Sequence, residues 1–97
     1  MKYEIFMAPE AVNDLKSLTA RNRSILLDAI EKHLRYEPDK ISRSRIKRLR
    51  GTAKPQYRLR VGEFRVFFDV AERSVEVLAI IPKTSAIVWL EKVGKFK

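Results

Sequence analysis

The sequence contains no cysteine and only one histidine, His33. These two absences argue against disulfides, cysteine-ligated metals and histidine clusters, so no metal is expected. No apolar run is long enough to span a membrane, and the N-terminus lacks the charged and apolar regions of a signal peptide. Together these features predict a cytoplasmic protein without membrane contacts and without a metal or small-molecule cofactor.

The positive charge of the chain is concentrated in one segment. The formal net charge is +9. Residues 40–65 hold ten basic residues against one acid, Glu63, whereas the rest of the chain has eleven of each sign. The ten are Lys40, Arg43, Arg45, Lys47, Arg48, Arg50, Lys54, Arg58, Arg60 and Arg65. A localised positive field attracts polyanions, chiefly nucleic acid. We therefore predict that the segment binds nucleic acid, in preference to a merely solubilising face, with contacts from Lys47, Arg48, Arg50 and Lys54.

The apolar pattern predicts a single α+β domain over residues 1–97. Residues 2–7 alternate as a strand, and two amphipathic helices follow, one opening at Pro9 and one over residues 20–36. Residues 39–55 have few apolar side chains and predict a basic surface connector with at most a turn of helix. Residues 57–61, 64–70 and 75–81 are typical of strands, and residues 85–92 of a short helix. The expected fold is an N-terminal helical hairpin packed on a small, mainly antiparallel four-stranded sheet, with a short C-terminal helix.

The predicted hairpin of residues 57–61 and 64–70 has one apolar and one basic face. Gly62 and Glu63 form a two-residue turn, which fixes the register of the two strands. Because side chains alternate along a strand, the core face carries Tyr57, Leu59, Val61, Phe64, Val66, Phe68 and Val70. The opposite face carries Arg58, Arg60, Arg65 and Phe67, with Asp69 near its end.

The arginines on this hairpin are unfavourable for stability. Arg60 is expected directly opposite Arg65, and like charges in a cross-strand pair repel. Guanidinium groups bind phosphates in bidentate fashion, and a ring such as Phe67 can stack on a base. The pattern therefore favours phosphate binding. The alternative is that Asp69 or Glu63 neutralises Arg65 while the other arginines point to water.

Three stretches of the sequence resemble the RelE/ParE toxin superfamily. They are Leu49-Arg50-Gly51, the run from Tyr57 to Phe68 that follows it, and the opening Ala8-Pro9-Glu10-Ala11. The resemblance covers residues 3–90. It implies the toxin of a type II toxin–antitoxin system, silenced by a cognate antitoxin protein that wraps around it.

The branches of this superfamily differ in activity. RelE-like toxins enter the ribosomal A site and cleave mRNA there, whereas ParE-like toxins poison DNA gyrase and are not nucleases. The cluster of cations favours the RelE-like branch, because a nuclease needs it and a gyrase binder does not. The chain is thus predicted to be a metal-independent endoribonuclease, an mRNA interferase whose partners are the ribosome and its mRNA. A gyrase poison and a non-toxic nucleic-acid-binding module are the alternatives.

The resemblance also implies which residues act. RelE-like nucleases contact the scissile phosphate with basic groups on the second and third strands and at the end of the fourth. The matching catalytic residues in this sequence are Arg58, Arg60, Arg65 and Lys83. Trp89 lies near the place where these enzymes put an aromatic residue that stacks on the substrate. It can equally serve to dock the last helix on the sheet.

The residues that would transfer protons differ most from those of the family. The family commonly has a lysine, proposed as general base, at the position of Arg60, and an arginine near Lys83. Arginine is not deprotonated near neutral pH, so Arg60 can only bind or stabilise charge. One histidine excludes a two-histidine mechanism, and His33 is expected on the flank of the long helix. Lys83 is the first choice for proton transfer; Glu63 is an alternative, and Tyr57 is discounted because it faces the core.

Overall fold

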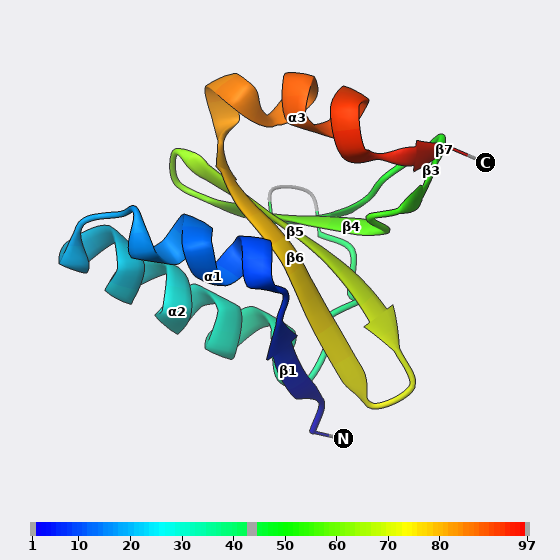
Figure 1. Ribbon diagram of the computed structural model, residues 1–97. Coiled ribbons are helices and arrows are strands. Elements are labelled where there is room, and N and C mark those ends of the chain that lie inside the picture. Colours follow the sequence, from blue (N-terminus) through cyan, green and yellow to red (C-terminus); the bar gives the residue numbers. More distant parts are fainter. Residues whose placement is uncertain (1, 43–44, 97) are drawn as a thin grey trace.

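The computed structural model describes residues 2–42 and 45–96 and has the predicted α+β architecture (Figure 1). Arg43, which belongs to the predicted basic segment, lies outside the described residues. The elements in chain order are β1 (Glu4–Met7), α1 (Pro9–Lys16), α2 (Ala20–Leu34), β2 (Ile46–Arg48), β3 (Thr52–Lys54), β4 (Tyr57–Val61), β5 (Phe64–Ala71), β6 (Ser74–Pro82), the 3₁₀ turn η1 (Lys83–Ser85), α3 (Ala86–Val93) and β7 (Lys95–Phe96).

The main sheet has five strands in the order β1-β6-β5-β4-β2. β1 pairs with β6 in parallel, and the other neighbours are antiparallel. The prediction of four strands and a plain connector over residues 39–55 was therefore wrong, because that segment forms β2 and β3. Ile46 is buried opposite Leu59, and Thr52 is buried with its hydroxyl donating to the Pro55 carbonyl at 3.0 Å. Strands of three residues depend on their neighbours for stability and leave little periodicity in the sequence.

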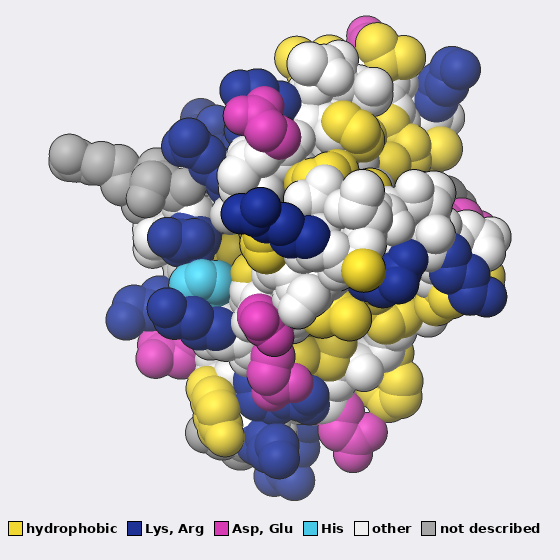
Figure 2. Space-filling model, turned by 90° about the vertical axis from the view of Figure 1, so that its left-hand side faces the viewer, with side chains coloured by type: hydrophobic (Ala, Val, Ile, Leu, Met, Phe, Trp, Pro, Cys, Tyr) yellow, Lys and Arg dark blue, Asp and Glu magenta, His cyan; other side chains and the backbone are white. Residues whose placement is uncertain are grey.

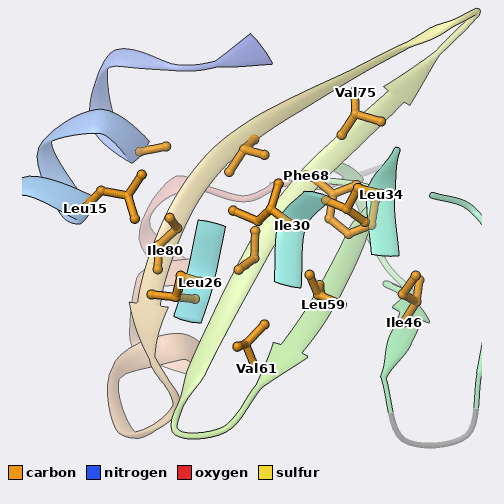
Figure 3. Close-up of a cluster of buried hydrophobic side chains, with 13 residues drawn as sticks. Leu15, Leu26, Ile30, Leu34, Ile46, Leu59, Val61, Phe68, Val75 and Ile80 are labelled. Carbon is orange, nitrogen blue, oxygen red and sulfur yellow. The ribbon is translucent and has the colours of Figure 1, made fainter. Parts of the chain in front are cut away.

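The helical hairpin of α1 and α2 covers one face of this sheet (Figure 1). The Thr19 side chain accepts a hydrogen bond from the Asn22 N–H, which caps the start of α2. Leu26, Ile30 and Leu34 of α2 point toward the sheet and belong to one buried cluster with side chains of β4, β5 and β6 (Figure 3). The predicted apolar face of the β4–β5 hairpin is confirmed as the core face. Within the described residues, no helix is long and apolar enough to cross a bilayer.

The opposite face of the sheet is covered at one point by α3. Three consecutive residues of β5, Val66, Phe67 and Phe68, are all buried, which requires cover on both faces because side chains alternate. Trp89 of α3 stacks on Phe67 with ring centroids 4.7 Å apart. β7 then pairs with β3 and ties the end of α3 to the rest of the chain. Among the described residues, the fold therefore has three layers where α3 lies over the sheet and two layers elsewhere.

Polar side chains join the start of β4 to the end of β5. The Asp69 carboxylate accepts from the Gln56 N–H at 2.7 Å, and the Gln56 side-chain oxygen accepts from the Val70 N–H at 2.9 Å. The Lys54 ammonium lies 3.9 Å from Asp69 Oδ2 and 3.7 Å from Glu76 Oε1. Burial raises the pKa of Asp69, against the opposing effects of the Gln56 hydrogen bond and Lys54.

Asp69→Asn is expected to keep the fold and to remove one pH-dependent loss of stability. Because the pKa of Asp69 is raised, the folded protein keeps this proton to a higher pH than the unfolded chain does. The stability that this group contributes therefore falls as pH rises from the ordinary aspartate pKa of about 4 through the folded value. Asparagine keeps an oxygen that accepts from the Gln56 N–H but carries no charge. The free energy of unfolding of the variant should therefore rise relative to that of the wild type across this pH range. Urea unfolding at a series of pH values tests this; a stability difference that does not change with pH would contradict it.

Candidate functional site

A cleft of about 490 Å³ lies between α3 and the basic face of the sheet. Three of the four predicted catalytic residues line it: Arg58 from β4, Arg65 from β5 and Lys83 from η1. Its remaining walls are mostly apolar and include Leu49, Phe67, Ala86, Ile87 and Leu90. The cleft therefore combines a cationic side, suited to a phosphate, with an apolar side.

The register of the sheet brings the cations together. Arg60 pairs with Arg65 across β4 and β5, and Lys47 pairs with Arg58 across β2 and β4. The predicted cross-strand arginine pair is confirmed. Arg60 is exposed and lies beside the cleft without lining it. It can attract an anion from that position, but the structure does not place it with the other three cations.

Arg58 is the most constrained cation of the cleft. Its Nε is buried without a hydrogen-bond partner, a condition found for no other buried side-chain nitrogen or oxygen of the described residues. Burial lowers the pKa of Arg58, and the charges of Arg65 and Arg60 lower it further. An arginine nevertheless stays charged near neutral pH. A buried donor without an acceptor is costly, and a phosphate oxygen is a suitable acceptor for it.

Arg65 is held by the hairpin turn. Its Nη1 donates to the Gly62 carbonyl at 3.0 Å and to the Phe64 carbonyl at 2.9 Å. Neither of the acids considered as its partner neutralises it in the described part of the chain. Glu63 pairs with Lys83 instead, and Asp69 lies beside Lys54. The charge of Arg65 is thus available to a ligand in the cleft.

Lys83 and Glu63 form an ion pair at the edge of the cleft. The Lys83 ammonium lies 3.2 Å from Glu63 Oε2, and the Lys83 N–H donates to the Glu63 carbonyl at 2.8 Å. Both residues considered for proton transfer therefore lie together, one as a cationic donor and one as an anionic acceptor. Tyr57, the third, faces the opposite side of the sheet, where it stacks on Phe68 at 5.4 Å.

Comparison with solved structures identifies the fold. A chain of the archaeal RelE–RelB complex from Pyrococcus horikoshii is 27% identical, with a TM-score of 0.69, and the match covers 86% of this chain and 97% of that one. A chain of the RelBE2 toxin–antitoxin complex from Mycobacterium tuberculosis is 21% identical, with a TM-score of 0.68 and coverages of 84% and 99%. A mutant of the E. coli toxin RelE in the free state is 18% identical, with a TM-score of 0.69 and coverages of 96% and 99%.

The chain has the RelE toxin fold. No protein-family model matches the sequence, and no curated protein matches it. Its similarity to RelE toxins is therefore carried by the three-dimensional structure, together with the hairpin motif. The structural matches extend over most of the chain, including the β4–β5 hairpin that supplies Arg58 and Arg65.

The two aromatic residues predicted to stack on RNA serve the packing of this RelE-like fold. Phe67 is only 2% exposed because Trp89 covers it. The prediction that Phe67 offers a free ring to a base needs correction, since its ring is taken up by α3. Trp89 is half-buried and docks the last helix on the sheet, which is the alternative considered for it.

The predicted RNA contacts of residues 47–54 divide between the two faces of the sheet. Lys47 is exposed beside Arg58, and Arg50 is exposed in the turn before β3. Arg48 lies on the other face, 5.1 Å above the Tyr57 ring, and donates to the Gln56 carbonyl at 2.7 Å. Lys54 is engaged with Asp69 and Glu76. The structure therefore places neither Arg48 nor Lys54 at the cleft.

Sequence reasoning missed the apolar wall of the cleft. Leu49, Ile87 and Leu90 line it, and Ile87 is 75% exposed. The only signal in the sequence was the apolar content of residues 86–90, which equally fits a helix docked on a sheet. A large apolar side chain exposed next to cations suits a ligand that is part ring and part phosphate.

Proposed function

We propose that this chain is the toxin of a type II toxin–antitoxin system and that it cleaves mRNA on the ribosome. The observation that carries the proposal is the convergence of Arg58, Arg65 and Lys83 on one cleft in a chain with the RelE fold. RelE–RelB and DinJ–YafQ neighbours are toxin–antitoxin complexes, which supports a cognate antitoxin as the partner here. Action on translating ribosomes would place the protein in the cytoplasm.

The proposed reaction uses the RNA's own 2′-hydroxyl as the nucleophile. This oxygen attacks the adjacent phosphorus, the bond to the 5′-oxygen breaks, and the products carry a 2′,3′-cyclic phosphate and a 5′-hydroxyl. The phosphorane formed on the way has two negative charges. Arg58, Arg65 and Lys83 would stabilise it, because donors placed where charge develops lower the barrier. The ribosome would supply the alignment of the codon.

Two proton transfers complete the reaction, one from the 2′-hydroxyl and one to the 5′-oxygen. Lys83 lines the cleft and carries a cationic donor, and Glu63 beside it carries an anionic acceptor; their ion pair opens when the two groups act on oxygens at opposite sides of the phosphorus. We assign Glu63 as the acceptor for the 2′-hydroxyl proton and the Lys83 ammonium as the donor to the leaving 5′-oxygen. The route uses only groups of this chain and of the RNA and calls for no metal ion.

Induced expression of the chain is expected to stop bacterial growth, and co-expression of its antitoxin to restore it. Purified protein added to translating ribosomes should yield breaks within the mRNA, which primer extension locates. Arg58→Ala should yield folded protein without these breaks. Growth arrest with intact mRNA and broken DNA would indicate the gyrase poison instead. Normal growth with folded, soluble protein would support the non-toxic binding module.

A further inference from the structure

A second cleft, of about 430 Å³, lies where the end of α2 meets β2. Its lining comes from the last turn of α2, the segment that follows and the start of β2: Lys32, His33, Tyr36, Glu37, Lys40, Ser42, Arg45 and Ile46. The single histidine of the chain lies here among Lys and Arg side chains, on the face shown in Figure 2. None of these residues takes part in the cleft beside α3.

The second cleft has an excess of positive charge. Its one carboxylate, Glu37, lies 3.7 Å from the Lys40 ammonium, and both of these side chains are largely exposed. Lys32 and Arg45 form no ion pair within the described residues. The Ser42 hydroxyl accepts hydrogen bonds from the Arg45 and Ile46 N–H groups at 3.0 and 3.1 Å, so the backbone that carries Arg45 is fixed.

Three arginines follow one another across neighbouring strands, from the first cleft to the edge of the sheet where the second cleft begins. Arg65 lines the first cleft, Arg60 pairs with Arg65 across the sheet, and the Arg60 N–H donates to the Arg45 carbonyl at 2.8 Å. Arg45 in turn lines the second cleft. Neighbouring strands lie about 4.8 Å apart, so the row spans about 10 Å of backbone. A flexible chain of phosphates can follow such a row, and each phosphate contact adds affinity.

We propose that the second cleft binds a backbone phosphate of the RNA strand whose scissile phosphate occupies the first cleft. The inference rests on the proposed function, because it extends the path of that substrate across Arg60 to Arg45. An acidic protein segment would also be attracted by the charge. RNA is favoured because the row begins in the proposed catalytic cleft and ends at Arg45, beside the edge strand β2, where a flexible strand can pass from the α3 side of the sheet to the end of α2.

His33 provides a reporter for this site. Burial lowers the pKa of His33, and the charges of Arg45 and Lys32 lower it further. The other titratable groups that line the cleft are Tyr36, Glu37 and Lys40. A bound phosphate offsets the cations and favours the imidazolium, so RNA in the second cleft should raise the pKa of His33.

The test compares two 2′-O-methyl oligonucleotides, which lack the attacking hydroxyl and stay intact. A dinucleotide fills only the first cleft, whereas a longer strand reaches both. Arg45→Ala should weaken binding of the longer strand about tenfold and reduce the salt slope by about 0.7, leaving the dinucleotide unaffected. The NMR-detected pKa of His33 should rise with the longer strand only. Arg21→Ala is the matched control, since this exposed residue lies twelve positions before His33 on α2, about 18 Å away.

Three results would overturn the proposal. The first is that Arg45→Ala behaves like Arg21→Ala. The second is that it weakens binding of both oligonucleotides equally, which would place its effect in the first cleft. The third is that polyglutamate binds with the same affinity, salt slope and Arg45 dependence as the longer strand, which would indicate an acidic protein partner. Failure of the proposed function gives a different pattern: dinucleotide binding that is insensitive to Arg65→Ala, together with intact mRNA on ribosomes.

Discussion

Arg65→Ala should reduce ribosome-dependent mRNA cleavage about a hundredfold while changing the free energy of unfolding by less than about 1 kcal/mol. The loss of activity is expected because Arg65 lines the cleft and its charge is not neutralised by Glu63 or Asp69. One donor aimed at charge that develops in a transition state typically contributes a factor of this size.

Stability should change little because two effects of removing Arg65 oppose each other. The variant relieves the repulsion of Arg60 across the strands, which is worth a few tenths to about 1 kcal/mol. It also loses the hydrogen bonds to the carbonyls of Gly62 and Phe64, each worth about 0.5–1.5 kcal/mol before solvent exposure reduces it. Cleavage and thermal unfolding would be measured on one preparation, with Arg21→Ala as control. Normal cleavage by a clearly destabilised variant would show that Arg65 contributes to stability and not to catalysis.

Phe67→Ala should lower the free energy of unfolding by about 3–5 kcal/mol and release α3 from the sheet. Phe67 is buried on the face opposite the helical hairpin, and Trp89 stacks directly on it. Its removal leaves a cavity beneath α3 and takes away the aromatic contact that holds this helix. Such a loss is a large part of the total stability of a domain of this size, which is about 5–15 kcal/mol.

The single tryptophan of the chain makes this effect measurable. Trp89 emission should shift to longer wavelength when Phe67 is removed, and amide exchange in α3 should accelerate in advance of global unfolding. Phe67→Leu is the matched variant, since it keeps most of the apolar volume without a ring and should retain cleavage. Loss of cleavage in Phe67→Leu at unchanged stability would show instead that the ring contacts RNA.

Much of the fold followed from local chemistry in the sequence. Pro9 marked the start of α1, and Gly62-Glu63 fixed the hairpin register, from which the opposition of Arg60 and Arg65 follows. A side-chain period of two is strict within a paired strand, so a known turn determines both faces. The short strands β2 and β3 could not be predicted in this way. Ile46 alone supplies the apolar contact of β2 with β4, and that contact depends on a partner distant along the chain.

Some features of the candidate site likewise followed from local sequence, and others depended on tertiary packing. The sequence alone determined which cations share the face of the β4–β5 hairpin, because alternation and register are local properties. Only the tertiary structure decided that Arg58, Arg65 and Lys83 meet in a cleft while Arg60 lies beside it, because that depends on where α3 crosses the sheet. It also decided that Phe67 is covered by Trp89, and that Arg45 continues the arginine row to a second cleft at the end of α2. Contacts between elements far apart in the chain are set by packing, which no local pattern records.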